Sequence, residues 1–188
     1  VLEVGCGPGK YVAVLSSLGC DVIGVDPHSF EYWSFLEKNT SAKLKSGQYA
    51  EQLPFPSRSF DAVSCLGALL YFDDPDKALR EIYRVLKPEG HLIIRNVNRR
   101  NLYTRLWRKN LDPASSNTYS IEELISFLEG HGFITLNHFA YGFFPPLFNK
   151  FWWYFTNGIL SLKVQKMLSD LTPPSCRLND VVFLRRGD

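Results

Sequence analysis

The sequence predicts an α/β fold in which one mostly parallel, doubly wound sheet carries helices on both faces. Short apolar runs rich in Val and Ile alternate with segments of helical periodicity, as expected for successive strand–helix–strand units. The first apolar run leads through a glycine-rich turn, G-C-G-P-G, into a helical segment. At 188 residues the chain is long enough for one well-buried domain and short for two. We therefore expect a single domain over residues 1–188.

The first half, residues 1–97, supplies five of the expected strands. Residues 1–4 form an almost continuous apolar run, typical of a strand buried on both faces. In chain order we expect strand 1–4, helix 11–18, strand 21–25, helix 29–38, strand 43–46, strand 60–66, helix 75–86 and strand 91–97. The segment Lys87-Pro88-Glu89-Gly90 should close the helix before it, because proline and glycine favour a turn.

The second half, residues 98–188, completes the sheet with two strands and carries an insertion. Ser120 and Glu123 have the spacing of a capping box, which predicts a helix ending near Gly130. Strands are expected at 133–139 and 181–184, which makes seven in all. A helical, aromatic insertion is expected at about 141–178, before the last strand. A connection of this length is usually functional.

The composition excludes several classes of protein. With 45% hydrophobic and 21% charged residues, the chain is neither disordered nor fibrous. The net charge of +2 is too small for a general nucleic-acid binder. Residues 1–94 hold 9 Lys and Arg against 12 Asp and Glu, whereas residues 95–188 hold 12 against 7. An anionic partner should therefore meet the second half.

Cysteine spacing and apolar runs indicate the compartment. The four cysteines are far apart and form no C-x-x-C pair, so we expect free thiols and no metal site. No secretory signal and no run of 18 uncharged apolar residues is present. We therefore expect a soluble, cytoplasmic protein. The chain lacks an initiator Met and begins inside an apolar run, so we also expect that an upstream segment, which would close over the active site, is missing.

The turn at residues 5–9 indicates a nucleotide-like ligand. Glycines between a buried strand and a helix let the backbone approach a ligand closely. The P-loop pattern G-x-x-x-x-G-K-[ST] is absent. The dinucleotide pattern G-x-G-x-x-G fails because its last position is Lys10. What remains is G-x-G-x-G after a strand that bears an acid.

At this point V-L-E-V-G-C-G-P-G resembles motif I of the class I S-adenosylmethionine-dependent methyltransferases. Three further segments match that family in order and spacing, so the resemblance covers about residues 1–97. They are V-I-G-V-D at 22–26, A-E-Q-L-P-F at 50–55 with S-F-D-A-V at 59–63, and A-L-R-E-I-Y-R-V-L-K-P-E-G-H-L-I-I at 78–94. The resemblance implies a Rossmann-like sheet and S-adenosylmethionine as cofactor, with S-adenosylhomocysteine as its product.

The resemblance also implies a cofactor site. Asp26 should accept hydrogen bonds from the two ribose hydroxyls. The alternative role for Asp26 is that of a helix cap or an Asx turn. Glu3 is expected near the methionine end of the cofactor. In the family an Asp often precedes the Ala that corresponds to Ala50, whereas this chain has Tyr49 there. Tyr49 would either stack on adenine or cover the pocket. The full set is Glu3, Gly5, Cys6, Gly7, Gly9, Asp26, Pro27, Tyr49, Ala50, Glu51, Cys65 and Leu66.

The expected reaction is an in-line displacement that depends mainly on positioning. The family has no universal catalytic residue, so substrate-side candidates come only from the carboxyl ends of strands. These are Tyr71, Asn96 and Asn98, for which surface or loop roles are equally open.

The acceptor should be a small or lipid-like molecule, because the second half is basic and aromatic. Basic residues lie at 95, 99, 100, 105, 108 and 109. They form either a solvated face or a contact for an anionic substrate or membrane surface. Residues 141–168 act as packed core, as a lid over an apolar acceptor, or as a peripheral membrane contact. Two classes of function remain open: an active methyltransferase, and a non-catalytic domain that binds the cofactor or a partner.

Overall fold

A computed structural model describes residues 1–100, 117–143 and 177–187. Seven strands form one sheet in the order β3-β2-β1-β4-β5-β7-β6. The strands are β1 (Leu2–Val4), β2 (Ile23–Val25), β3 (Lys43–Lys45), β4 (Phe60–Leu66), β5 (Leu86–Val97), β6 (Phe133–Phe143) and β7 (Arg177–Arg186). The helices of the described ranges are α1 (Lys10–Ser17), α2 (Tyr32–Asn39), the 3-10 turn η1 (Leu69–Tyr71), α3 (Pro75–Val85) and α5 (Ile121–Glu129).

The predicted sheet is confirmed as mostly parallel and doubly wound. β1 to β5 pair in parallel, whereas β7 lies antiparallel between β5 and β6. From β1 the chain moves outward through β2 to β3, and then returns to place β4 on the other side of β1. This reversal of direction lies between β1 and β4. In open α/β sheets a crevice at such a point holds the ligand.

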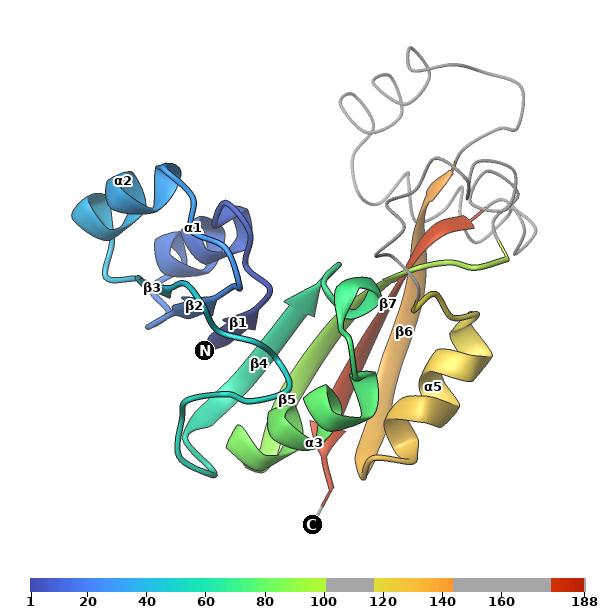
Figure 1. The fold of residues 1–188 in the computed structure, drawn as a ribbon. Coiled ribbons are helices and arrows are strands. Elements are labelled where there is room, and N and C mark those ends of the chain that lie inside the picture. The colour runs from blue at the N-terminus through green and yellow to red at the C-terminus, as the bar shows by residue number, and fades with distance from the viewer. Residues whose placement is uncertain (101–116, 144–176, 188) are drawn as a thin grey trace.

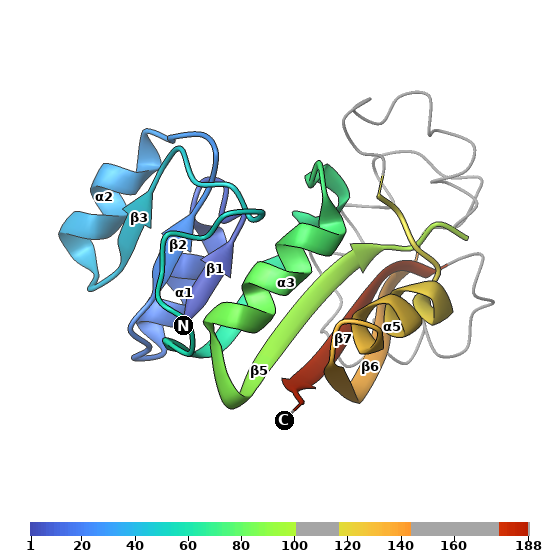
Figure 2. The ribbon, with the colours of Figure 1, turned by 60° about the horizontal axis from the view of Figure 1, so that its bottom comes forward.

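Two hydrophobic clusters hold the helices to the sheet. The larger cluster joins α3 and α5 to the sheet and includes Leu79, Ile82, Leu92, Leu124 and Leu128. Figures 1 and 2 show α3 and α5 on the same face of the sheet. The smaller cluster joins α1 and α2 to the segments that lead into β2 and β3 and includes Cys6, Val12, Val22, Trp33 and Ala42.

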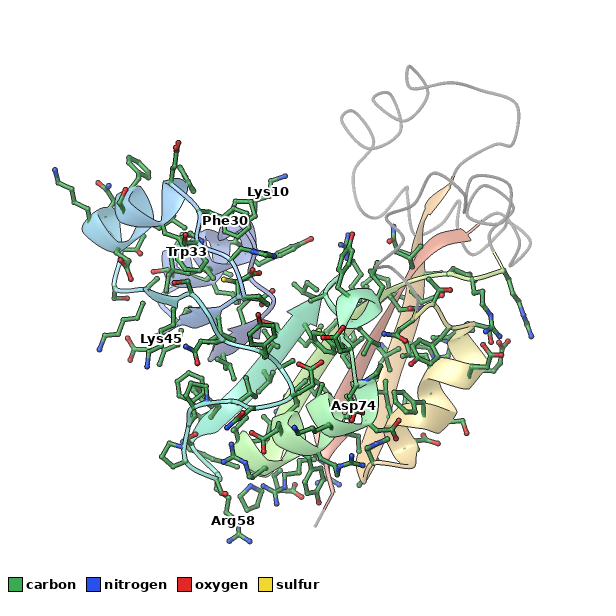
Figure 3. The ribbon with its side chains drawn as sticks, viewed as in Figure 1. Lys10, Phe30, Trp33, Lys45, Arg58 and Asp74 are labelled. Carbon is green, nitrogen blue, oxygen red and sulfur yellow. The ribbon has the colours of Figure 1, made fainter. Side chains whose placement is uncertain are left out.

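Two helix starts agree with the sequence signals. Ser120 and Glu123 form the complete capping box at the start of α5. α3 begins with Asp74, labelled in Figure 3, whose side chain accepts a hydrogen bond from the backbone N–H of Lys77. Pro75 takes the first helical position, where its missing N–H costs nothing.

The predicted turn at Lys87–Gly90 is wrong in its boundaries. β5 already begins at Leu86, which pairs with Phe60, and pairing resumes at His91 opposite Ala62. The four residues between Leu86 and His91 therefore lie opposite Asp61 alone, and Lys87 donates to the Asp61 carboxylate at 2.6 Å. The turn is an irregularity inside the strand pairing, which composition alone does not distinguish from a loop.

The insertion expected at about 141–178 is shorter at both ends. β6 extends to Phe143 and β7 begins at Arg177, because these strands continue the antiparallel pairing beyond the expected strands. The remainder of the insertion, including its expected helical part, lies outside the described residues. No helix in the described ranges has the length and apolar character needed to cross a bilayer.

Candidate functional site

A cavity of about 520 Å³ lies at the carboxyl ends of β1, β2 and β4. Its walls come from the glycine-rich turn after β1, the segments after β2 and β3, and the turn after β4. The lining residues are Val4, Gly5, Gly7, Asp26, Pro27, His28, Phe30, Gln48, Tyr49, Ala50, Glu51, Leu66, Gly67, Ala68, Tyr71, Phe72 and Asp73. The cavity thus lies at the reversal point between β1 and β4.

Most residues proposed from the sequence meet at this cavity. Those that line it are Gly5, Gly7, Asp26, Pro27, Tyr49, Ala50, Glu51 and Leu66, with the substrate-side candidate Tyr71. Those that lie behind its wall instead are Glu3, Cys6, Gly9 and Cys65. The lining residues absent from the predicted set are Val4, His28, Phe30, Gln48, Gly67, Ala68, Phe72 and Asp73. Their signal was position, since each lies within a few residues of a predicted site residue.

The glycines of the turn serve different purposes. Gly5 has φ +70°, and a Cβ atom there would lie 2.2 Å from the Cβ of Ala68, so glycine lets the turn after β4 pack against it. Gly7 has φ +50°, and a Cβ atom there would meet nothing within 4 Å. Gly7 also lines the cavity. A Cβ atom at Gly9 would lie 2.5 Å from Leu36 Cδ1, so Gly9 serves the packing of α1 on α2.

Asp26 presents a carboxylate whose orientation is fixed by two backbone amides. Its Oδ2 accepts from the N–H of Gly7 at 2.8 Å, and its Oδ1 accepts from the N–H of His28 at 2.9 Å. The second bond is the Asx turn considered from the sequence. Each carboxylate oxygen can accept a further hydrogen bond. The side chain is 8% exposed and lines the cavity, so it can receive two neighbouring hydroxyl groups.

Trp33 of α2 fixes the same turn from the other side. Its indole N–H donates to the carbonyl of Gly7 at 2.8 Å. Its ring lies 5.8 Å from that of Phe30, centroid to centroid, and Figure 3 shows both side chains between α2 and α1. The N–H of Gly7 is therefore held by Asp26, which follows β2, and its C=O is held by Trp33 of α2. No pattern in the sequence indicates this role, because an apolar helix position is ordinarily core.

Glu51 joins two walls of the cavity. Its Oε1 accepts from the backbone N–H of Asp73 at 3.0 Å and from that of Asp74 at 3.3 Å. Residue 51 follows β3, whereas residues 73 and 74 follow η1 and lead into α3. The carboxylate therefore fastens the loop before β4 to the start of α3. It lies at a helix N-terminus, where a negative charge is favourable.

Glu81 and Arg84 of α3 hold the continuation of that loop. Arg84 donates to the carbonyl of Leu53 at 3.0 Å and to that of Phe55 at 2.7 Å. Glu81 accepts from the N–H of Leu53 at 2.9 Å and forms an ion pair with Arg84 at 2.7 Å. This contact holds the pKa of the Glu81 carboxyl below its usual value. The A-E-Q-L-P-F and R-E-I-Y-R-V motifs are thus two sides of one contact.

Glu3 is a buried carboxyl behind the cavity. It is 1% exposed, and its Oε2 accepts from the hydroxyl of Ser64 on β4. Burial raises the pKa of Glu3 to about 7, against the lowering effects of Ser64, the backbone at Leu66 and the charge of Arg95. Because this pKa lies near neutral pH, a small change in the surroundings of Glu3 changes the fraction of the carboxyl that is ionised.

The two buried cysteines of the site are not nucleophiles. Burial raises the pKa of the Cys6 and Cys65 thiols to about 12. Both remain neutral near pH 7 and act as small packing residues. Cys6, Cys20 and Cys65 are free thiols, as expected from their spacing.

Of the substrate-side candidates, Tyr71 lines the cavity and Asn96 and Asn98 do not. Tyr71 is 51% exposed at the end of η1. Asn96 is buried and donates to the carbonyl of Tyr119 at 2.9 Å. Asn98 is also buried and accepts from the N–H of Arg100 at 2.9 Å. Both side chains therefore bond to backbone between β5 and α5, and the substrate role expected for them stays a prediction.

Part of the basic patch expected in the second half is neutralised by acids. Arg99 forms an ion pair with Glu123, and Arg100 forms one with Glu122 at 3.2 Å. Both acids lie in the first turn of α5. At these two positions the patch is a paired, solvated surface. The basic residues at 105, 108 and 109 lie outside the described residues.

The cavity suits an organic ligand. Within residues 1–100, 117–143 and 177–187, no group of three or more His, Cys, Asp or Glu side chains could hold a metal ion. The lining combines backbone amides, the carboxylate of Asp26 and the aromatic rings of Phe30, Tyr49 and Tyr71. This set matches a ligand with a flat ring, hydroxyl groups and no net negative charge.

Comparison with known proteins gives a consistent result. Residues 2–94 match a family model described as "Methyltransferase domain". The chain is 36% identical over 98 residues to the uncharacterized methyltransferase YcgJ of Bacillus subtilis, which covers 50% of this chain and 39% of YcgJ. It is 31% identical over 106 residues to a ubiquinone biosynthesis O-methyltransferase of Pseudomonas fluorescens, which covers 53% of this chain and 44% of that protein. The chain thus spans less than half the length of these curated relatives.

Solved structures share the fold over the whole chain. The crystal structure of YcgJ aligns with a TM-score of 0.69 at 20% identity, over 100% of this chain and 91% of YcgJ. The 1,6-didemethyltoxoflavin-N1-methyltransferase of Burkholderia thailandensis, solved with S-adenosylhomocysteine bound, aligns with a TM-score of 0.67 at 17% identity, over 100% of this chain and 70% of that protein. At these identities the likeness concerns the fold alone.

Proposed function

The chain belongs to the class I S-adenosylmethionine-dependent methyltransferase family, and from this premise we propose that it transfers a methyl group from S-adenosylmethionine to a small-molecule or lipid-like acceptor. The carrying observation is the carboxylate of Asp26. One backbone N–H fixes each of its oxygens, and the remaining acceptor capacity of both lies at the cavity. That arrangement fits the two hydroxyls of a ribose.

The remaining cavity wall fits the other parts of the cofactor. Gly7 leaves open space at the turn, as a ligand that lies against the backbone requires. Ala50 and Tyr49 stand where the resemblance implies adenine, and Tyr49 is 56% exposed at the cavity, where its ring can stack on a base. The cavity of about 520 Å³ falls within the usual range for small-molecule pockets.

The chemistry that this site supports is displacement at an activated methyl group. S-adenosylmethionine supplies, when bound, an electrophilic methyl on a sulfonium. The chain contributes orientation: the glycine turn and Asp26 fix the nucleoside, and the turn after β4 forms the wall on which the reacting end would rest. Alignment of the reacting atoms supplies much of the acceleration in such a transfer.

The acceptor would approach past Tyr71 and Phe72, which line the cavity beyond the β4 turn. Both present aromatic rings, and the lining residues include no Lys or Arg. This lining favours an uncharged or lipid-like acceptor over an anionic one. Among the compared proteins, one acts in ubiquinone biosynthesis, which is consistent with an apolar, ring-containing acceptor. Contact with a membrane through residues 141–168 stays a prediction, because most of these residues lie outside the described ranges.

A second candidate function is a domain that binds the cofactor without catalysing transfer. Tyr49 favours this second candidate. A neutral phenol in place of the expected carboxylate cannot accept a hydrogen bond from the adenine amino group with a full negative charge. Both functions require binding of the cofactor, so only methyl transfer distinguishes them.

Two measurements test the proposal. Calorimetry should show that the wild type binds S-adenosylhomocysteine and that Asp26→Ala binds it more weakly. Asp61→Ala, which removes an exposed carboxylate away from the cavity, is the matched control and should bind as the wild type does. A transfer assay with methyl-labelled S-adenosylmethionine against lipid, quinone and nucleotide-sugar pools should label one acceptor class. Binding without any labelled acceptor would favour the second candidate, and no binding would contradict both.

A further inference from the structure

The turn after β4 is supported from behind by Arg95. Leu66 and Gly67 line the cavity, and Leu66 pairs directly with Arg95 across the β4–β5 ladder. The Nη2 of Arg95 donates to the carbonyl of Leu66 at 3.3 Å. Arg95 itself is half-buried and is not among the lining residues. Its guanidinium therefore contacts the cavity wall from the side away from the ligand.

Gly67 makes room for this guanidinium. A Cβ atom at Gly67 would lie 2.1 Å from Nη2, 3.0 Å from Cζ and 3.2 Å from Nε of Arg95. The guanidinium thus lies directly against the Gly67 backbone, which has φ +95°. On the other side of the same turn, Ala68 packs against Gly5. The turn is therefore held between the glycine-rich turn and Arg95.

Arg95 also acts on the charge of Glu3. The carboxyl of Glu3 lies on β1, beside Ser64 of β4, with which it pairs in the ladder. The positive charge of Arg95 opposes the effect of burial on the pKa of Glu3. The groups that act on or respond to Glu3 are the Ser64 hydroxyl, the Leu66 backbone, the Arg95 guanidinium and the Cys6 and Cys65 thiols. Both thiols stay neutral, so Arg95 is the cation of this set.

We propose that Arg95 is a positioning residue of the cofactor site, which fixes the β4 turn through Leu66 and Gly67. The inference rests on the proposed function, in which Glu3 lies near the ammonium group of the cofactor. The charge of Arg95 favours the ionised form of Glu3, which attracts that ammonium. Loss of Arg95 should therefore raise the pH at which the site binds its ligand best.

The first test needs no ligand. The contribution of Glu3 to the free energy of unfolding is measured by urea titration from pH 4 to 9, as the difference between each protein and its Glu3→Gln derivative. In Arg95→Met the midpoint of that pH dependence should move upward, because an opposite charge is lost. Arg95→Lys should retain most of the wild-type midpoint. Arg99→Met removes an exposed, remote arginine and should leave it unchanged.

The second test uses S-adenosylhomocysteine in calorimetry over pH 6 to 8.5. Titration of the ligand itself is common to all variants and cancels in their comparison. Arg95→Met and Gly67→Ala should each weaken binding at pH 7 by about tenfold, and Arg95→Met should shift the rise in affinity to higher pH. If Arg95→Met folds poorly, Gly67→Ala and Arg95→Lys still decide the question. A wild-type affinity and pH profile in Arg95→Met, or a wild-type affinity in Gly67→Ala, would overturn the role of Arg95. A wild type that binds no ligand at any pH would instead overturn the proposed function, while the unfolding test still judges Arg95.

Discussion

Replacement of Glu3 by glutamine should make the chain more stable at neutral pH and leave it little changed in acid. Glu3 has a pKa of about 7 in the folded chain, against 4.5 for an exposed glutamate. The fold therefore prefers the protonated carboxyl. Between pH 4.5 and about 7 the unfolded chain releases this proton and the folded chain retains it. The free energy of unfolding should thus fall as pH rises through that interval.

The size of the effect follows from the difference between the two pKa values. Each pKa unit corresponds to about 1.4 kcal/mol, so Glu3 should lower the free energy of unfolding by about 3 kcal/mol between pH 4.5 and pH 8. The amide of a glutamine can still accept from Ser64 and does not ionise. The stability gained in Glu3→Gln should therefore grow by that amount over the interval and level off above pH 8.

Urea unfolding followed by tryptophan fluorescence, at half-unit steps from pH 4 to 8.5, measures this difference. Glu81→Gln is the matched control, because the ion pair with Arg84 lowers the pKa of Glu81. Its contribution has the opposite sign: it is present above pH 4.5 and is lost as pH falls further. A stability difference between Glu3→Gln and wild type that stays constant with pH would refute the assignment of the buried, titrating carboxyl to Glu3.

Three further changes test the ligand side. Asp26→Ala should weaken binding of S-adenosylhomocysteine by about 1.5–3 kcal/mol, or roughly 10- to 150-fold in Kd by calorimetry; an unchanged Kd would refute the ribose assignment. Gly7→Val should abolish binding while the chain still unfolds cooperatively in urea, because the side chain would enter open cavity space; retained binding would show that the ligand lies elsewhere. Trp33→Phe keeps the packing but removes the bond to the Gly7 carbonyl, so it should cost about 1 kcal/mol of stability and weaken binding; a variant equal to wild type in both would show that the bond is dispensable.

Much of the fold could be predicted because its signals are local. The strand at Phe60–Leu66 was predicted with its observed bounds, and the capping box at Ser120 set the start of α5. The boundaries that failed depend on partners far along the chain. Leu86 is a strand residue because Phe60 lies opposite it, and β6 extends to Phe143 because Arg177 pairs with it. No window of sequence contains both members of such a pair.

The site divides in the same way. Asp26 and the glycine turn could be proposed as a ligand site because a ligand would constrain their type and spacing directly. The roles of Trp33 and Arg95, and the backbone bonds of Glu51, could not be predicted, because they join the backbone of other segments. An indole that donates to a carbonyl looks like any core tryptophan in sequence. Asn96 and Asn98 were proposed from their position at a strand end, whereas in the structure their side-chain amides bond to the backbone of Tyr119 and Arg100.

Each wall of the cavity is held by a side chain that either does not line the cavity or forms its hydrogen bonds outside the cavity. The glycine turn is fixed by Trp33 of α2, the loop after β3 by Glu51 at the start of α3, and the β4 turn by Arg95 of β5. A site whose walls are fixed before the ligand arrives avoids an ordering cost on binding. Substitutions at Trp33 and Arg95, which do not line the cavity, should therefore change ligand affinity without removing any ligand contact. They should leave the chemical nature of the lining intact, which separates their effect from that of Asp26.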